Sequence, residues 1–245
     1  MAETTIDEKI DILSGAEVCF LMASTLLYQE PTVESIADQR ADKTFVSAPF
    51  GMDNDQVKKG LALMESWCES APTDAAAFDE AVSDLKREWF RLFVGAGTPD
   101  APSWEGYYVD PNSQIIGVNT LAVRRWYQKY GLQIENLNRE PDDNLGLMLG
   151  FLAHLIGCEA DALTEGDTAK AEEISADIDT FLTEHILPWI TTWHYDVEKH
   201  ATSDYFRGVG DLVFGFCEAA AAWFGIHFDA TTNSFKRGKA NELVS

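Results

Sequence analysis

The segment PDDNLGLMLGFLAHLI, residues 141–156, decides the fold class of this chain. Its apolar side chains recur every three or four residues, at Leu145, Met148, Leu149, Leu152, Leu155 and Ile156. That spacing puts them along one side of an α-helix, and their density indicates a helix that is buried on more than one side. Pro141 stops any helix that precedes it, and Asp142 is expected to cap the N-terminus of this one.

The same spacing recurs on both sides of this segment. Apolar stripes with helical periodicity lie at 78–92, 118–126, 174–182 and 212–223, and an opening helix is predicted near 7–28. Strand signals are sparse, and the best of them, 106–109, is short and flanked by prolines. The sequence therefore predicts an all-α protein.

A long irregular segment, GAGTPDAPSWEGYYVDPNSQIIG at 95–117, divides the chain. We treat 1–245 as a single helical domain, with an N-terminal half at about 1–94 and a C-terminal half at 118–245. A loop of this length inside a compact domain is often functional. It could equally be a hinge, which would permit a domain-swapped dimer, although a monomer is the simpler expectation.

The charge of the chain limits its partners. Among 245 residues there are 18 Lys+Arg against 41 Asp+Glu, a net charge of −23. Such a field repels nucleic acid and anionic membrane surfaces and attracts basic peptides. The N-terminus lacks the basic region of a signal peptide, and the most apolar stretch, 212–228, is too short to span a bilayer. We therefore expect a cytoplasmic protein without stable membrane association.

Signals of metal binding or catalysis are missing. None of the five histidines has a glutamate three residues before it, as helical di-metal sites require. His194 and Glu198 lie four residues apart and are expected to form a surface salt pair. Zinc spacing, a serine nucleophile elbow and a phosphate loop are absent from the sequence. Four cysteines in apolar helical contexts are expected to be buried free thiols. We predict a binding protein without metal or cofactor.

Aromatic and acidic residues indicate what such a protein could bind. The aromatic and apolar candidates are Trp89, Leu92 and Phe93 at the end of a predicted helix and Trp104, Tyr107 and Tyr108 in the 95–117 segment. The acidic candidates are Glu140, Asp142 and Asp143. An apolar groove beside an acidic patch suits a peptide with arginines followed by a hydrophobic stretch. The simpler alternatives are that Trp89 and Phe93 belong to the core and that the acids cap a helix.

Three motifs in these regions resemble those of a known family. EWFRLFVG at 88–95 is similar to E-x-x-R-L-F-V-G, and PSWEGYY at 102–108 is similar to P-x-W-[EG]-S-x-[YW]. EPDDN at 140–144, followed by FLAHL at 151–155, resembles E-P-D-D-H and F-x-A-H-L. Together they resemble the TorD/DmsD/NarJ-type cytoplasmic chaperones, which help to mature molybdenum-containing redox enzymes. The resemblance covers roughly 15–225.

The resemblance implies a bundle of about ten helices without catalytic turnover. Its members bind the twin-arginine signal peptide of a partner enzyme, keep the apoenzyme competent for cofactor insertion and delay its export. The family's peptide-binding residues correspond here to Trp89, Leu92, Phe93, Pro102, Trp104, Asp143 and Asn144. With Tyr108, Glu140 and Asp142, these form our predicted peptide-binding site. In it, Asp143 and the nearby acids meet the arginines, and Trp89, Leu92, Phe93 and Trp104 receive the hydrophobic region.

Two departures from the motifs leave alternatives open. Asn144 stands where the family has His and cannot titrate near neutral pH, and Gly106 replaces a Ser. A chaperone for a cytoplasmic client without a twin-arginine leader is therefore the first alternative. A metal-dependent helical enzyme is the second.

Overall fold

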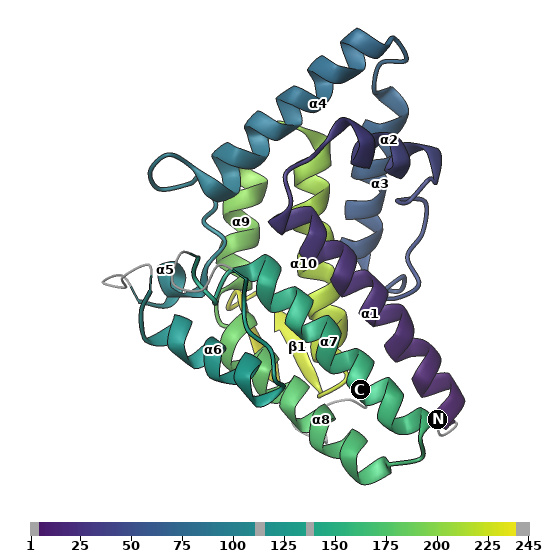
Figure 1. Cartoon of the computed structure of the whole chain (residues 1–245), viewed down its shortest axis with the longest axis vertical. Coiled ribbons are helices and arrows are strands. Elements are labelled where there is room, and N and C mark those ends of the chain that lie inside the picture. The colour runs from purple at the N-terminus through teal and green to yellow at the C-terminus, as the bar shows by residue number, and fades with distance from the viewer. Residues whose placement is uncertain (1–4, 111–115, 136–139, 239–245) are drawn as a thin grey trace.

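The computed structural model describes residues 5–110, 116–135 and 140–238, and within them nearly all of the regular secondary structure is helical (Figure 1). Ten α-helices are present in the described residues: α1 (Ile6–Tyr28), α2 (Val33–Ala41), α3 (Asp55–Ser70), α4 (Ala75–Trp89), α5 (Glu105–Val109), α6 (Val118–Lys129), α7 (Leu145–Thr164), α8 (Thr168–Phe181), α9 (Ile190–His200) and α10 (Asp204–Ala222). Two π-helical turns, η1 (Phe90–Val94) and η2 (Leu182–Ile186), continue α4 and α8, and strands β1 (Ile226–Asp229) and β2 (Ser234–Arg237) form an antiparallel hairpin. The all-α prediction of about ten helices is confirmed.

Helices from the two halves of the chain pack against each other. α1 lies along α7, and α3 lies along α10, so each of these pairs joins an N-terminal helix to a C-terminal one (Figure 1). α8 packs on the other side of α7, as the dense apolar pattern of that helix predicts. One continuous core of buried side chains runs through all these contacts.

The α3–α10 contact depends on two glycines. A Cβ added to Gly208 would lie 2.7 Å from the backbone oxygen of Gly60, and one added to Gly60 would lie 2.7 Å from the backbone oxygen of Gly208. The helix backbones therefore touch at this point. This close approach holds the helices that carry the N-terminal and C-terminal parts of the core in register.

The cap of α7 differs from the prediction. Asn144, not Asp142, is the N-cap residue, and its side-chain oxygen accepts a hydrogen bond from the Gly146 N–H at 2.9 Å. Asp142 lies two residues further upstream, where it is fully buried and its carboxylate binds Arg124. Asparagine is among the best N-cap residues, so its presence in place of the family's histidine suits this structural position.

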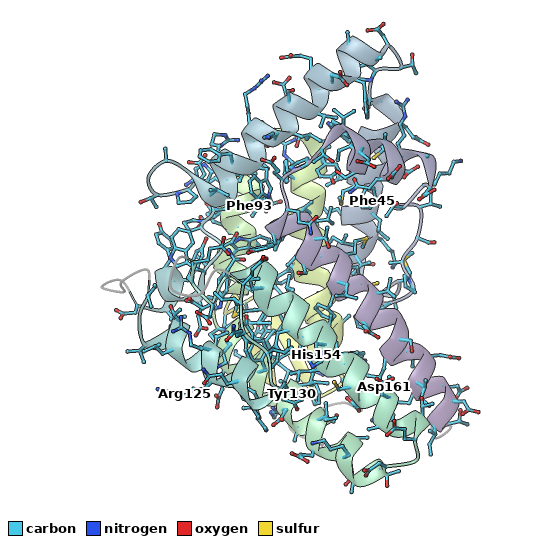
Figure 2. All side chains as sticks on the ribbon, in the orientation of Figure 1. Phe45, Phe93, Arg125, Tyr130, His154 and Asp161 are labelled. Atoms are coloured by element: carbon cyan, nitrogen blue, oxygen red, sulfur yellow. The ribbon has the colours of Figure 1, made fainter. Side chains whose placement is uncertain are left out.

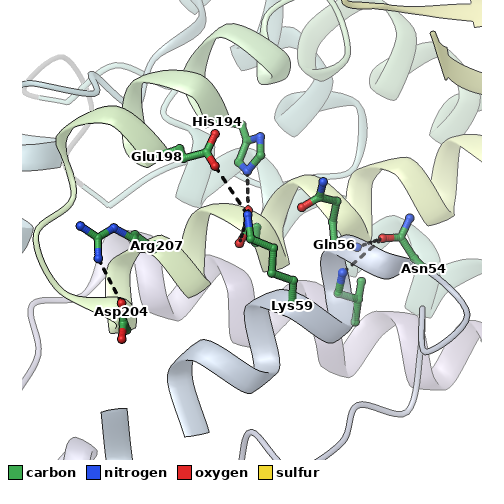
Figure 3. A network of polar contacts seen from close by, with 9 residues as sticks. Asn54, Gln56, Lys59, His194, Glu198, Asp204 and Arg207 are labelled. Carbon is green, nitrogen blue, oxygen red and sulfur yellow. Dashed lines mark hydrogen bonds and ion pairs between the residues drawn. The ribbon is translucent and has the colours of Figure 1, made fainter. Parts of the chain in front are cut away.

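Two predicted local features are wrong. Residues 106–109, the best strand candidate, lie in the short helix α5, and the strands occur instead at 226–237, where no strand was predicted. His194 does not pair with Glu198; it bonds to Asp211 of α10 at 2.7 Å. Lys59 reaches from α3 to both acids, at 3.1 Å from Asp211 and 3.6 Å from Glu198 (Figure 3). This buried aspartate thus joins α3, α9 and α10.

Two helices, α1 and α7, are long and apolar enough to cross a membrane by length and composition alone. Sixty-seven per cent of the apolar window of α7 and 44% of that of α1 is buried within the protein. A core helix of a globular protein passes the same test, so this is weak evidence for a membrane span. The four cysteines are free, as predicted, and three of them are buried. Burial raises the pKa of Cys217 to about 12.

We predict that Gly208→Ala destabilises the protein by roughly 1–3 kcal/mol, because its new methyl group overlaps the backbone of α3. The clash should outweigh the gain in helix propensity that alanine normally brings. Gly97→Ala is the matched control, since a Cβ at Gly97 meets no atom within 4 Å and should leave stability nearly unchanged. Urea denaturation of the three proteins measures the difference, and equal midpoints for both variants would contradict the close-contact interpretation.

Candidate functional site

An open groove of about 530 Å³ lies where the end of α1, the turn η1 and two connecting segments meet. Its walls are formed by Leu27, Tyr28, Trp89, Phe93, Val94, Gly97, Ser103, Trp104, Glu140, Pro141 and Asn144. Five of the ten predicted site residues are among them. The three motif segments therefore converge on one surface, although they are far apart in the sequence.

The first wall comes from α4 and η1. The Trp89 indole donates a hydrogen bond to the backbone oxygen of Leu27 at 3.0 Å, which fixes the ring against α1. Phe93 is 4% exposed and packs between Trp193 and Phe206, with ring centroids at 6.2 and 5.8 Å (Figure 2 labels Phe93). Its ring is therefore core on one side and groove lining on the other.

Leu92 lies behind this wall. Its side chain is fully buried and does not line the groove, so it supports the wall rather than contacting a ligand. The π-helical geometry at Phe90–Val94 widens the last turn of the helix, and Gly95 ends it with φ at +64°. π-turns are frequent at functional sites.

The second wall is Trp104 with Asn144. These two residues form an isolated antiparallel bridge. On one side of it the Leu145 N–H donates to the Ser103 backbone oxygen at 2.7 Å, and on the other the Glu105 N–H donates to the Asp143 backbone oxygen at 3.1 Å. Trp104 is thereby held by main-chain bonds to the segment that begins α7.

The buried Asp143 carboxylate reinforces the contact between the Trp104 segment and the start of α7. It is 1% exposed, and it accepts hydrogen bonds from the Gly106 N–H at 2.9 Å and from the Thr120 hydroxyl at 2.7 Å. Burial raises the pKa of Asp143, although both hydrogen bonds oppose that effect. The predicted contact of Asp143 with a client arginine therefore does not fit the structure, since this acid is buried and already satisfied.

Asp142 is also occupied within the protein. It is 0% exposed and accepts two hydrogen bonds from the Arg124 guanidinium, at 3.0 and 2.8 Å. Its backbone oxygen accepts a third from the Tyr127 hydroxyl at 2.8 Å. Asp142 and Asp143 together anchor α6 and α5 to the start of α7, which is a positioning role.

Pro102 and Tyr108 also lie away from the groove. Pro102 is buried. The Tyr108 ring stacks on Trp189 with centroids 5.1 Å apart, and its hydroxyl donates to Asp196 at 3.2 Å. The predicted peptide contact of Tyr108 is thus replaced by contacts that fasten α5 to α9 and to its N-cap residue, Trp189.

A buried pair fastens the same helix to η2. Glu105 and His185, 4% and 6% exposed, lie 3.0 Å apart between oxygen Oε2 and nitrogen Nδ1. Burial raises the pKa of Glu105, and the hydrogen bond to His185 opposes this rise. His154, from the third motif, lies elsewhere, with its ring near Tyr130 between α6 and α7 (Figure 2).

The acid that faces the groove is Glu140. It is half-buried, and the Tyr28 hydroxyl donates to its carboxylate. Leu27, Tyr28 and Val94 line the groove but were not predicted. Tyr28 ends an apolar helix, and no local pattern shows that this helix end lies beside the second and third motifs.

The comparison with known protein families agrees with the resemblance indicated by the motifs. The sequence model of the family described as nitrate reductase delta subunit matches residues 54–194, which include all three motifs. The chain belongs to this family. It is thereby a member of the TorD/NarJ-type group to which the motifs pointed.

Similar curated proteins are chaperones by name. The chain is 27% identical over 158 residues to a protein named Tat proofreading chaperone DmsD from Salmonella typhimurium, covering 61% of this chain and 71% of the relative. It is 26% identical over 155 residues to a probable Tat proofreading chaperone DmsD from Haemophilus influenzae, covering 63% and 68%. A chaperone protein TorD from Actinobacillus pleuropneumoniae is 22% identical over 143 residues, covering 58% and 64%.

We predict that Asp143→Ala destabilises the protein by about 2–4 kcal/mol, because the buried Gly106 N–H loses its acceptor and the Thr120 hydroxyl loses its bond to this carboxylate. Asp143→Asn should cost much less, since its amide carbonyl still accepts from Gly106 and its NH₂ donates to the Thr120 oxygen. Thermal denaturation of both variants measures this order, and equal losses would contradict it.

The pH dependence gives a separate test of the same carboxylate. A carboxyl whose pKa is raised by folding binds more protons in the folded state than in the unfolded one. Its contribution to the free energy of unfolding therefore falls as pH rises from the unfolded pKa through the raised one. The stability of the wild type relative to Asp143→Asn should decline over that acidic range, and a relative increase would refute the burial effect.

Proposed function

We propose that this chain is a cytoplasmic chaperone that binds the twin-arginine signal peptide and the apo form of a molybdenum-containing oxidoreductase. It assists cofactor insertion, delays export until maturation is complete and performs no catalysis. Family membership and the chaperone names of its relatives support the class of function. The single observation that carries the proposal is the groove in which Trp89, Phe93 and Trp104 meet Glu140.

The groove has the two chemical properties that a signal peptide requires. Its apolar walls suit the hydrophobic part of the peptide, and aromatic side chains bury much area with little loss of conformational freedom. The Glu140 carboxylate at the same surface suits a guanidinium group, for which a carboxylate is the natural bidentate partner. We assign the arginine contact to Glu140, in place of the buried Asp143.

The walls are fixed before the peptide arrives. Trp89 is hydrogen-bonded to α1, and Trp104 is held through the strand-like bridge to Asn144. A site that needs no reordering loses less conformational entropy when it binds. Asn144 serves this purpose through its backbone and its cap of α7, neither of which requires an imidazole.

We predict that the wild type binds a synthetic twin-arginine peptide with an adjoining leucine-rich stretch at micromolar concentration. Trp104→Ala should weaken binding about tenfold or more, because it removes an aromatic wall. Glu140→Gln should weaken it about threefold to tenfold, as expected for one partly exposed charge-assisted contact. Isothermal titration calorimetry at constant pH measures both losses.

Tyr195→Ala is the matched control, because Tyr195 is an exposed aromatic residue on α9 that does not line the groove. Its affinity for the peptide should equal that of the wild type. Absence of binding by the wild type, or equal losses in Tyr195→Ala and Trp104→Ala, would refute the proposal. Binding of an apoenzyme that lacks its leader, without any binding of the peptide, would favour the alternative of a client without a twin-arginine leader.

We predict that salt slows association. The net charge of −23 attracts a cationic peptide over a distance that shrinks as the ionic strength rises. Between about 50 mM and 500 mM NaCl the association rate constant should fall roughly tenfold or more, with a smaller change in the dissociation rate constant. Stopped-flow fluorescence resolves the two, and a salt-independent association rate would contradict the electrostatic part of the proposal.

A further inference from the structure

A second cleft, of about 600 Å³, lies away from the groove. It is bounded by the first half of α1, the segment before α3, the end of α10 and strand β1. Ile12 lines this cleft and Leu27 lines the groove, and these residues lie fifteen positions apart on α1. At 1.5 Å per residue they are about 22 Å apart along the helix, so the two sites are distinct.

The walls of this second cleft are aromatic. Phe50 and Trp223 lie with ring centroids 5.2 Å apart, and Phe228 of β1 adds a third ring. Phe50 is 8% exposed and Trp223 is 36% exposed, so Trp223 is the more accessible of these two lining residues. Aromatic faces of this kind attract cations as well as apolar groups.

Two carboxylates, Asp53 and Glu218, line the same cleft, and among its described lining residues there is neither lysine nor arginine. Glu218 is held in place because one of its oxygens accepts a hydrogen bond from the Asn54 amide at 2.8 Å. The Asn54 side chain is itself fixed, since its oxygen caps α3 by accepting from the Gln56 and Val57 N–H groups (Figure 3). Asp53 has neither a side-chain hydrogen bond nor an ion pair among the described residues.

We propose that this cleft is a second binding site, which takes an arginine or lysine side chain next to an apolar residue on a partner polypeptide. Two acids and aromatic rings lining one cleft complement a cation, and the remaining apolar wall complements its neighbour. A second copy of this chain fits poorly, because each copy carries a net charge of −23 and repels the other. The site goes beyond the proposed function and does not depend on it.

The cleft lies almost entirely outside the residues that the family model matches. Apart from Asn54, its lining residues lie before or after the matched segment 54–194. It is therefore formed almost entirely by the segments that flank the matched residues.

The test uses the peptide N-acetyl-Phe-Arg-Arg-Leu-amide and the same peptide with both arginines replaced by citrulline, a neutral group of the same shape. Titration of the ¹⁵N-labelled full chain should shift the signals of Gly51, Ala219 and the Trp223 indole saturably with the arginine peptide. The affinity at these signals should fall at least about fivefold with citrulline.

The variant pair Asp53→Asn with Glu218→Gln should cause a similar loss of affinity. It preserves the fold, because the glutamine carbonyl still accepts from the Asn54 amide. The groove variant Trp104→Ala should leave the signals of the second cleft unchanged. Equal binding of the citrulline peptide, unchanged binding by the doubly substituted variant, or shifts confined to Trp89 and Trp104 would each overturn the inference. Failure of a twin-arginine leader to bind at Trp104 would refute the proposed function and leave this inference standing.

Discussion

One buried carboxylate, Asp143, makes the groove possible. It accepts hydrogen bonds from the Gly106 N–H in α5 and from the Thr120 hydroxyl in α6, while its own backbone oxygen accepts from the Glu105 N–H. These bonds tie the irregular segment after η1 to the start of α7. Together with the bond from the Leu145 N–H to the Ser103 backbone oxygen, they hold Trp104 in the wall of the groove. The Asp143 carboxylate therefore has its hydrogen-bond partners inside the protein. Its burial raises its pKa.

Burial determines which of these acids form bonds within the protein and which one faces the groove. Asp142 and Asp143 satisfy their oxygens within the protein, and Glu140 remains half-buried at the groove. The excess of negative charge acts at longer range, on the approach of a cationic partner rather than on its final contacts. The groove, at the C-terminal end of α1, and the second cleft, beside its first half, are the two places where a cationic segment is proposed to bind.

Six helices were predictable because their apolar residues follow the helical period: α1, α4, α6, α7, α8 and α10. The other four, α2, α3, α5 and α9, were not predicted individually. The hairpin at 226–237 was missed because two four-residue strands give too few alternations to stand out. At 106–109 the bonds of Gly106 and Glu105 to Asp143 favour a short helix, and that contact spans 37 residues of sequence. Local patterns do not contain such a contact.

Part of the site was predictable, because its residues lie in the sequence motifs, and part was not, because it depends on tertiary contacts. The motifs correctly brought Trp89, Phe93, Trp104, Glu140 and Asn144 to one surface. They did not distinguish the half-buried Glu140 from the buried Asp142 and Asp143, because neighbouring carboxylates carry no local sign of their burial. The contribution of Tyr28 depends on the packing of α1 against α7, which only the tertiary structure shows.

Photo-crosslinking locates the bound peptide on the protein. A twin-arginine peptide with a benzophenone in its hydrophobic stretch would be irradiated with the intact protein, and the attachment points would be mapped by mass spectrometry. The account predicts attachment within 89–97 and 103–104, reduced by excess unlabelled peptide. Attachment that is equally strong elsewhere and absent from these segments would contradict the claim that the groove held in place by Asp143 receives the peptide.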